Sequence, residues 1–240
     1  MLRSIVWYGK FIIDLVVITP KLKKSATILE KEGQQAYDDF VFPVVEKWAA
    51  GRLVDSGADI VIHNPERIPQ DINVLFVSNH QGNFDIPIFI AKIPKRVGFV
   101  AKIETTKLPL IRDWMKAIRC VFLDRNDMKQ SMKTIIEAIG ILKEGYSMVV
   151  FPEGTRAKGG PMGEFKAGSF KLATKSNVPI VPVTICGSYK LMESNNNKIK
   201  PAHVDVYIHE PIVVAGMSRE EQNALHTRVE AIVKSKLTEA

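Results

Sequence analysis

From residue 57 onward the sequence alternates short apolar runs with helix-like stretches, and this alternation limits the fold more than any other feature. The runs are continuously apolar, which is typical of strands that are buried on both faces of a sheet. They cover residues 60–62, 74–77, 97–100, 121–123, 148–151, 180–183 and 204–207. The helix-like stretches cover residues 84–92, 109–118, 128–144, 167–176 and 218–238. The pattern predicts an α/β fold, a largely parallel sheet covered by helices.

Residues 1–56 have a different pattern. Residues 5–18 are apolar except for Gly9, Lys10 and Asp14. A helix of this length reaches about 20 Å, short of the roughly 30 Å hydrocarbon core of a bilayer. An amphipathic helix is expected over residues 28–53, ending at Gly51 or Gly57. We therefore expect a membrane-associating helical hairpin over 1–56 and an α/β domain over 57–240.

The distribution of charge favours a lipid surface. The chain has a net charge of +7, of which residues 1–24 carry +4 beside the most apolar segment. Nucleic-acid binding would need a basic and aromatic stripe on the folded domain, which the sequence lacks. Interface-anchoring side chains flank the apolar helix: Trp7, Tyr8, Lys21, Lys23 and Lys24. They predict peripheral or one-leaflet association with the cytoplasmic side of the cell membrane. The alternative is that this helix packs into the core of the domain.

The cysteines and most of the histidines suggest structural roles. Cys120 and Cys186 lie in apolar runs and are expected to be buried, reduced thiols, which fits the cytosol. Lys10 and Asp14 are spaced to pair along one helix face. No metal is expected, because four of the five histidines form no ligand-spaced cluster with carboxylates or thiols. These four are His63, His203, His209 and His226.

One candidate for acid–base chemistry follows the predicted strand at 74–77. His80 and Asp85 are five residues apart, and a turn through Gly82 is needed to bring them together because a continuous helix would point them about 140° apart. Asn83 is a candidate N-cap for the helix that follows. A carboxylate beside an imidazole sets the tautomer and raises the basicity of the other ring nitrogen. The pair therefore predicts a general base, and the alternative is a surface histidine beside a helix-capping aspartate.

Cations follow three other strands. Lys102 comes after one strand and Arg125 after the next, and the segment Glu153, Gly154, Thr155 and Arg156 follows a third. Because the carboxyl ends of parallel strands share one edge of a sheet, we expect the three cations to converge on a phosphate. The alternatives are solvated surface cations and a structural salt bridge between Glu153 and Arg156.

Together these motifs resemble the glycerolipid acyltransferase family, typified by lysophosphatidate acyltransferase. His80 and Asp85 match its catalytic His-x4-Asp motif, and Lys102 with the stretch ending at Arg125 resembles its second block. Residues 151–156 match the third block, and residues 178–183, which include Pro182, resemble the fourth. The resemblance covers residues 73–188. Departures from the family pattern concern the acceptor and the chain length rather than the catalytic pair, and they lie at Thr105, Arg112, Cys120 and Ala157.

The resemblance implies transfer of a fatty acyl chain from acyl-CoA or acyl-ACP to the sn-2 hydroxyl of lysophosphatidic acid, giving phosphatidic acid for phospholipid biosynthesis. No cofactor is implied beyond that acyl co-substrate. His80 would take the hydroxyl proton and Asp85 would orient it. Lys102, Arg125 and Arg156 would hold the phosphate, with Glu153 positioning them, Gly154 and Thr155 completing the loop, and Pro182 shaping the wall. The alternatives are a phospholipid-binding protein without turnover, a hydrolase, and an acyltransferase for another lysophospholipid.

Overall fold

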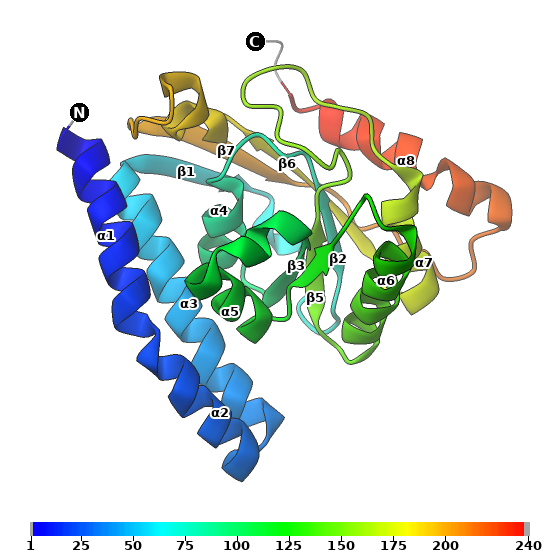
Figure 1. Ribbon diagram of the computed structural model, residues 1–240. Coiled ribbons are helices and arrows are strands. Elements are labelled where there is room, and N and C mark those ends of the chain that lie inside the picture. The colour runs from blue at the N-terminus through cyan, green and yellow to red at the C-terminus, as the bar shows by residue number, and fades with distance from the viewer. Residues whose placement is uncertain (1, 238–240) are drawn as a thin grey trace.

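The computed structural model describes residues 2–237 and contains one seven-stranded sheet flanked by helices (Figure 1). The strands are β1 (Ala58–His63), β2 (Leu75–Ser78), β3 (Val97–Lys102), β4 (Val121–Leu123), β5 (Ser147–Val150), β6 (Ile180–Cys186) and β7 (Ala202–Ile208). The helices are α1 (Leu2–Ile18), α2 (Pro20–Glu32), α3 (Gln34–Ser56), α4 (Asp85–Lys92), α5 (Pro109–Ala117), α6 (Met128–Lys143), α7 (Lys171–Ser176) and α8 (Arg219–Lys234).

The sheet has the strand order β1-β7-β6-β2-β5-β3-β4. Neighbouring strands are parallel except for β6 and β7, which are antiparallel. Each predicted apolar run corresponds to a strand, and each helix-like stretch after residue 57 corresponds to a helix. The predicted fold class is therefore confirmed.

Helices cover both faces of the sheet, and alternate residues of each strand point to opposite faces. Phe76 of β2 packs with α3, α4 and α5 in one hydrophobic core. Leu75 and Val77, its neighbours in the same strand, pack with α6, α7 and α8 in a second core. Because the central strands are buried on both sides, their sequence is apolar throughout, which explains the pattern that predicted them.

The first three helices form a long hairpin beside the sheet (Figure 1). Its reversal lies at Gly33, between α2 and α3, so residues 28–32 belong to α2 and not to the helix predicted over 28–53. The helical structure continues past Pro20 as α2. Pro20 is the first residue of that helix, where its missing N–H breaks no helical hydrogen bond. The hairpin shares the first hydrophobic core with the sheet. Its division from residues 57–240 as a separate domain stays a prediction.

Polar contacts tie α1 to α3 and replace the expected Lys10–Asp14 pair. The Lys10 ammonium lies 2.7 Å from a carboxylate oxygen of Asp55, and Asp14 pairs with Arg52. Trp7 is no interface anchor, since its side chain is buried in the core and its indole N–H donates to the Arg52 carbonyl at 2.9 Å. Part of the apolar helix thus joins the core, as the alternative interpretation expected.

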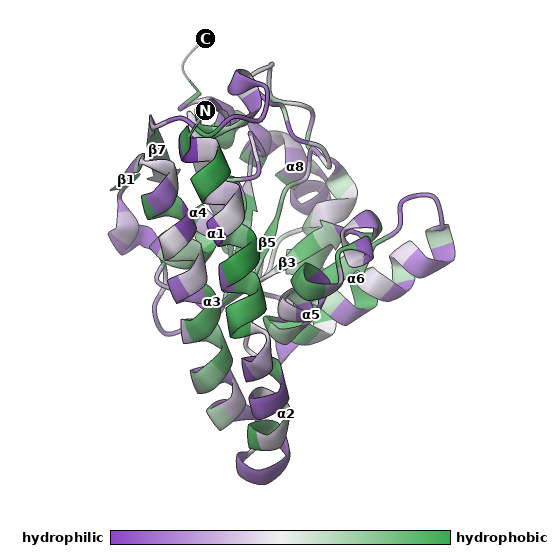
Figure 2. Ribbon diagram, turned by 60° about the vertical axis from the view of Figure 1, so that its left-hand side comes forward, coloured by the Kyte–Doolittle hydropathy of each residue, from purple (hydrophilic) through white to green (hydrophobic). Residues whose placement is uncertain are grey.

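The outer face of α1 remains apolar and exposed. Figure 2 shows the hydrophobic colouring along this helix. Its exposed large apolar side chains are Leu2, Ile5, Val6, Ile12, Ile13, Val16 and Val17. Within residues 2–237 we find no helix with both the length and the apolar character needed to cross a bilayer.

The amino-terminal half of α1 is fastened to the connection between β6 and β7. The Tyr8 hydroxyl donates to the Asn197 carbonyl at 2.8 Å, and the Ile199 N–H donates to the Ser4 hydroxyl at 3.0 Å. The Trp7 ring also lies 5.4 Å, between centroids, from the ring of Phe84, the residue before α4. This half of the helix therefore contacts both the β6–β7 connection and the last residue of the β2–α4 turn.

The two cysteines differ in burial. Cys120 is buried as expected, and this burial raises the pKa of its thiol to about 12. Cys186 is only half-buried, because it ends β6, and its thiol donates to the Lys236 carbonyl at 3.2 Å. A thiol whose pKa is this high is rarely a thiolate near neutral pH, so Cys120 is unsuited to act as a nucleophile.

Gly98 in β3 lies close to the backbone of the turn before β4. A Cβ at this position would lie 2.4 Å from the carbonyl oxygen of Arg119, which is a backbone atom. Arg119 itself adopts a positive φ of 65° in the turn before β4.

We expect Gly98→Ala to lower the free energy of unfolding by about 1–3 kcal/mol, because β3 or the Arg119 turn must shift. Gly140 in α6 is the matched control, since a Cβ added there would meet no neighbouring part of the chain within 4 Å. Gly140→Ala should raise stability by roughly 0.5–1 kcal/mol through helix propensity. Urea unfolding measures both, and equal midpoints for the two variants would contradict the close approach.

Candidate active site

A turn at the carboxyl edge of the sheet joins β2 to α4 and contains His80. Nδ1 of His80 lies 2.7 Å from Oδ2 of Asp85, the first residue of α4. The Asp85 side chain is fully buried, and that of His80 keeps 17% of its surface exposed. The turn thus brings together the two residues that the sequence placed in one pair.

Asp85 is the centre of this turn because its carboxylate accepts hydrogen bonds from several directions. Oδ2 accepts from the backbone N–H groups of Gln81 at 2.7 Å and Gly82 at 3.0 Å, in addition to His80. Oδ1 accepts from the hydroxyl of Ser188, which is fully buried. These donors satisfy the acceptor oxygens of a carboxylate that water cannot reach.

This arrangement selects the tautomer of the neutral imidazole. An anionic Asp85 accepts from Nδ1–H of His80, so Nε2 carries the free lone pair. The His80 ring stacks on Phe151, with 4.1 Å between centroids and 17° between planes. Ring orientation and tautomer are therefore both set, and Nε2 is suited to accept a proton from a hydroxyl.

Side-chain amides attach the turn to β6. Asn79 donates to the Ile185 carbonyl at 2.9 Å and accepts from the Ile185 N–H at 2.8 Å, as a paired strand residue would. The Gln81 side-chain oxygen accepts from the Gly187 N–H at 2.7 Å. The turn therefore cannot move relative to β6 without breaking buried hydrogen bonds.

The loop after β5 packs against the turn that contains His80. Glu153 accepts from the His80 N–H at 2.6 Å and from the Gly163 N–H at 2.7 Å. Burial raises the pKa of the Glu153 carboxyl, and these two hydrogen bonds oppose that rise. The sequence interpretation had Glu153 position the cations or pair with Arg156. In the structure it contacts the backbone of the His80 turn instead, because the loop carries its carboxylate inward.

Of the three expected cations, Arg156 belongs to this loop, and Arg125, which follows β4, contacts it. Arg125 donates to the Gly154 carbonyl, and Gly154 adopts a positive φ of 74°, which favours glycine at this position. Nη1 of Arg156 donates to the Asn83 side chain and lies 3.2 Å from the carboxylate of Glu193. The ion-pair partner of Arg156 is therefore Glu193 and not Glu153.

The other expected binding residues stay predictions. Lys102 is exposed at the end of β3, in register with Leu123, which precedes Arg125 by two residues. Thr155 is exposed on the loop, and Pro182 is buried in β6 opposite Val77. Convergence of the three cations on one phosphate also stays a prediction, and Arg125 contacts the loop to which Arg156 belongs.

Sequence reasoning missed Ser188 and Glu193. Ser188 follows the carboxyl end of β6 by two residues, so the rule that useful residues follow parallel strands pointed to its segment. Glu193 lies in the 3-10 helix η5 (Glu193–Asn195) beside a polar run and carried no local signal. Its importance depends on a contact with Asn83, 110 residues earlier in the chain.

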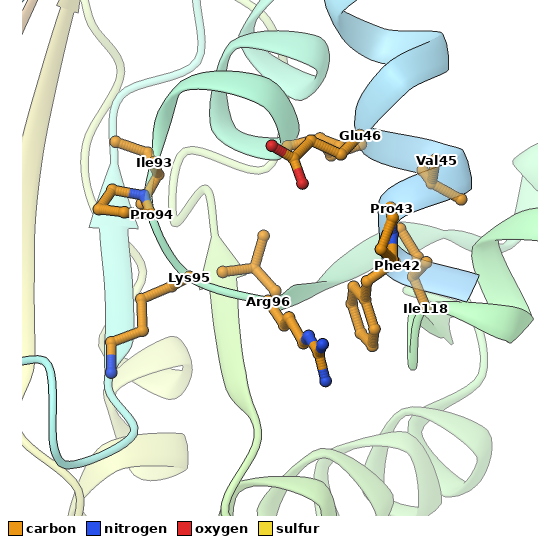
Figure 3. A pocket seen from close by; sticks show the side chains of 11 residues that line it. Phe42, Pro43, Val45, Glu46, Ile93, Pro94, Lys95, Arg96 and Ile118 are labelled. Atoms are coloured by element: carbon orange, nitrogen blue, oxygen red, sulfur yellow. The ribbon is translucent and has the colours of Figure 1, made fainter. Parts of the chain in front are cut away.

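A separate hollow of about 220 Å³ lies at the amino end of β3. Figure 3 shows Phe42 and Arg96 among the side chains that line it. Arg96 is paired there with Asp39, at 2.5 Å between Nη2 and Oδ1. His80 follows the carboxyl end of a parallel strand, so this hollow and the candidate site lie at opposite edges of the sheet.

In residues 2–237, no cluster of three or more His, Cys, Asp or Glu side chains is arranged to hold a metal ion.

Comparisons with known proteins agree with this geometry. The family model described as Acyltransferase matches residues 59–186. A probable 1-acyl-sn-glycerol-3-phosphate acyltransferase of Mycoplasma pneumoniae is 34% identical, over 81% of this chain and 76% of its own. A chloroplastic 1-acyl-sn-glycerol-3-phosphate acyltransferase of Arabidopsis thaliana is 36% identical, over 64% of this chain and 43% of its own. The crystal structure of the 1-acyl-sn-glycerophosphate acyltransferase of Thermotoga maritima superposes with a TM-score of 0.82 at 29% identity, covering 98% of this chain and 94% of that one.

The hydrogen bond from Ser188 to Asp85 yields a stability prediction. Ser188→Ala removes a donor from a buried anionic oxygen, so we expect the free energy of unfolding to fall by about 1.5–3 kcal/mol. Ser235, at the exposed end of α8, is the control, and Ser235→Ala should change stability by less than about 0.5 kcal/mol. Urea unfolding measures the free energy of unfolding of both variants. A similar decrease in the two would show that the hydrogen bond from Ser188 to Asp85 does not stabilise the fold.

Proposed function

The chain belongs to the glycerolipid acyltransferase family, and from this premise we propose that it transfers a fatty acyl chain from an acyl thioester to the sn-2 hydroxyl of lysophosphatidic acid. The observation that carries the proposal is the His80–Asp85 pair, joined at 2.7 Å with Nε2 left to accept a proton. A protein that only binds phospholipid head groups needs no such pair. The product is phosphatidic acid, a substrate for phospholipid biosynthesis.

The proposed reaction is a direct attack on the thioester. Nε2 of His80 takes the proton as the acceptor hydroxyl oxygen forms a bond to the thioester carbonyl carbon. The tetrahedral intermediate collapses, the carbon–sulfur bond breaks, and the thiolate leaves and takes the proton from His80. The anion of Asp85 stabilises the imidazolium that forms between these two steps. The donor, acyl-CoA or acyl-ACP, needs no further activation, because a thiolate leaves readily.

Acceptor binding is assigned to the cations beside the turn. Arg156 is held at Asn83, which lies between His80 and Asp85 in the sequence, and Arg125 is held by the loop that carries Arg156. A phosphate bound by these guanidinium groups would place the free glycerol hydroxyl near Nε2. Lys102, Thr155 and Pro182 complete the proposed acceptor site.

Replacing the base tests this function directly. His80→Ala should abolish acyl transfer, and Asp85→Asn should lower kcat by about two to four orders of magnitude through loss of tautomer control. Purified protein is assayed with lysophosphatidic acid and, in parallel, acyl-CoA and acyl-ACP. Folding of each variant is checked by circular dichroism. Wild-type turnover in folded His80→Ala would remove the base mechanism, and chain release without an acceptor would indicate a hydrolase.

We also propose that α1 associates with one leaflet on the cytoplasmic side of the membrane. Its exposed apolar face is the main support, and the exposed lysines at the start of α2 add about 1 kcal/mol each toward anionic lipid. These lysines are Lys21, Lys23 and Lys24. The buried side of the same helix belongs to the core, so deletion of α1 would confuse membrane release with unfolding.

Surface substitutions separate these effects. Ile13→Gln with Val17→Gln removes apolar surface from α1 at two side chains that are each more than half exposed. We expect this double variant to lose most of its flotation with anionic liposomes while its thermal midpoint changes little. Val213→Gln, at a similarly exposed residue outside the hairpin, is the control and should float as the wild type does. Equal flotation of all three proteins would exclude this face of α1 as the anchor.

A further inference from the structure

Glu193 is a buried carboxylate next to the candidate active site. Its side chain is only 3% exposed, although it lies in the short helix η5 between β6 and β7. Oε1 accepts from the Asn83 N–H at 2.7 Å and lies 3.2 Å from Nη1 of Arg156. One carboxylate oxygen therefore joins the His80 turn to the loop that carries Arg156.

The second oxygen of Glu193 is unusual. Within the described part of the chain, Oε2 is buried and has no hydrogen-bond partner. It lies against Gly82, where a Cβ would approach it to 2.5 Å. A buried carboxylate that leaves one oxygen unpaired carries a desolvation cost that its contacts must offset. The charge partner that offsets it here is Arg156.

These contacts restrain the guanidinium of Arg156 from one end only. The Asn83 side chain and Glu193 both contact Nη1, which leaves the N–H groups of Nη2 and Nε for a ligand. The Arg156 side chain remains 32% exposed, so a ligand can reach it. An arginine held in this way has lost most of its rotamer freedom before it binds an anion.

We propose that Glu193 is a positioning residue for the acceptor: its buried charge holds Arg156 in the orientation that binds the phosphate of lysophosphatidic acid. This proposal rests on the proposed function. Glu193 touches neither His80 nor Asp85, so we expect it to affect acceptor binding and not proton transfer. Gly82 contributes to this arrangement, because the absence of a side chain there leaves room for the Glu193 carboxylate.

The test is the charge-removing variant Glu193→Gln, which keeps the size of the side chain and an oxygen for the Asn83 N–H. We expect the KM for lysophosphatidic acid to rise by about 10–100-fold, while kcat and the KM for the acyl donor change by less than about threefold. Arg156→Ala sets the upper limit of the effect. Glu193→Asp retains the charge and should raise the acceptor KM less than Glu193→Gln does.

Glu230 provides a matched control, because it is another glutamate that accepts a backbone N–H, that of Phe165 at 2.7 Å. Glu230→Gln should leave the acceptor KM unchanged. An unchanged acceptor KM in Glu193→Gln, or an equal rise for both substrates, overturns the proposal. If Glu193→Gln does not fold, Arg156→Ala decides it, since an acceptor KM in Arg156→Ala equal to that of the wild type overturns the proposal. A wild-type protein without acyl transfer to lysophosphatidic acid instead refutes the proposed function itself.

Discussion

The burial of one negative charge, that of Asp85, organises the edge of the sheet at which the candidate site lies. A fully buried carboxylate is tolerated only when donors surround it, and here they come from the turn before α4 and from Ser188 after β6. The same requirement draws His80 onto the carboxylate. The strand order places β6 beside β2, so residues that are more than a hundred positions apart meet at this charge. Catalytic geometry and local stability therefore depend on the same set of hydrogen bonds.

A second buried carboxylate, Glu193, contacts the same turn. Asp85 orients the imidazole, and Glu193 contacts the guanidinium of Arg156. In the proposed reaction, Asp85 thus serves removal of the proton and Glu193 serves recognition of the phosphate. Glu153 adds a third carboxylate, which contacts the backbone of His80. A site crowded with carboxylates remains stable because each one faces a particular donor.

Sequence patterns predicted the strands and helices well, because strands buried on both faces must be apolar throughout and the helices between them must be amphipathic. They also identified His80 and Asp85, since both residues lie in one turn. What they missed depends on distant contacts. Lys10 and Asp14 are spaced to pair with each other, but Asp55 and Arg52 of α3 are their partners. Trp7 has the composition of an interface anchor, yet the core of the folded chain buries it. Glu193 had no recognisable neighbours in sequence, so no local pattern could identify it.

The fastening of α1 has a geometrical consequence. Ser4 and Tyr8 bond to the same connection that carries Glu193, and Trp7 packs on the residue before Asp85. On the proposed membrane association, this helix cannot sink into or rise out of a leaflet without carrying the acceptor site with it. The depth at which the helix lies in the leaflet then sets the distance of the His80 imidazole from the hydrocarbon layer. Acceptors would be sorted by how far their free hydroxyl lies from the hydrocarbon boundary, a criterion that operates before any contact with their head group.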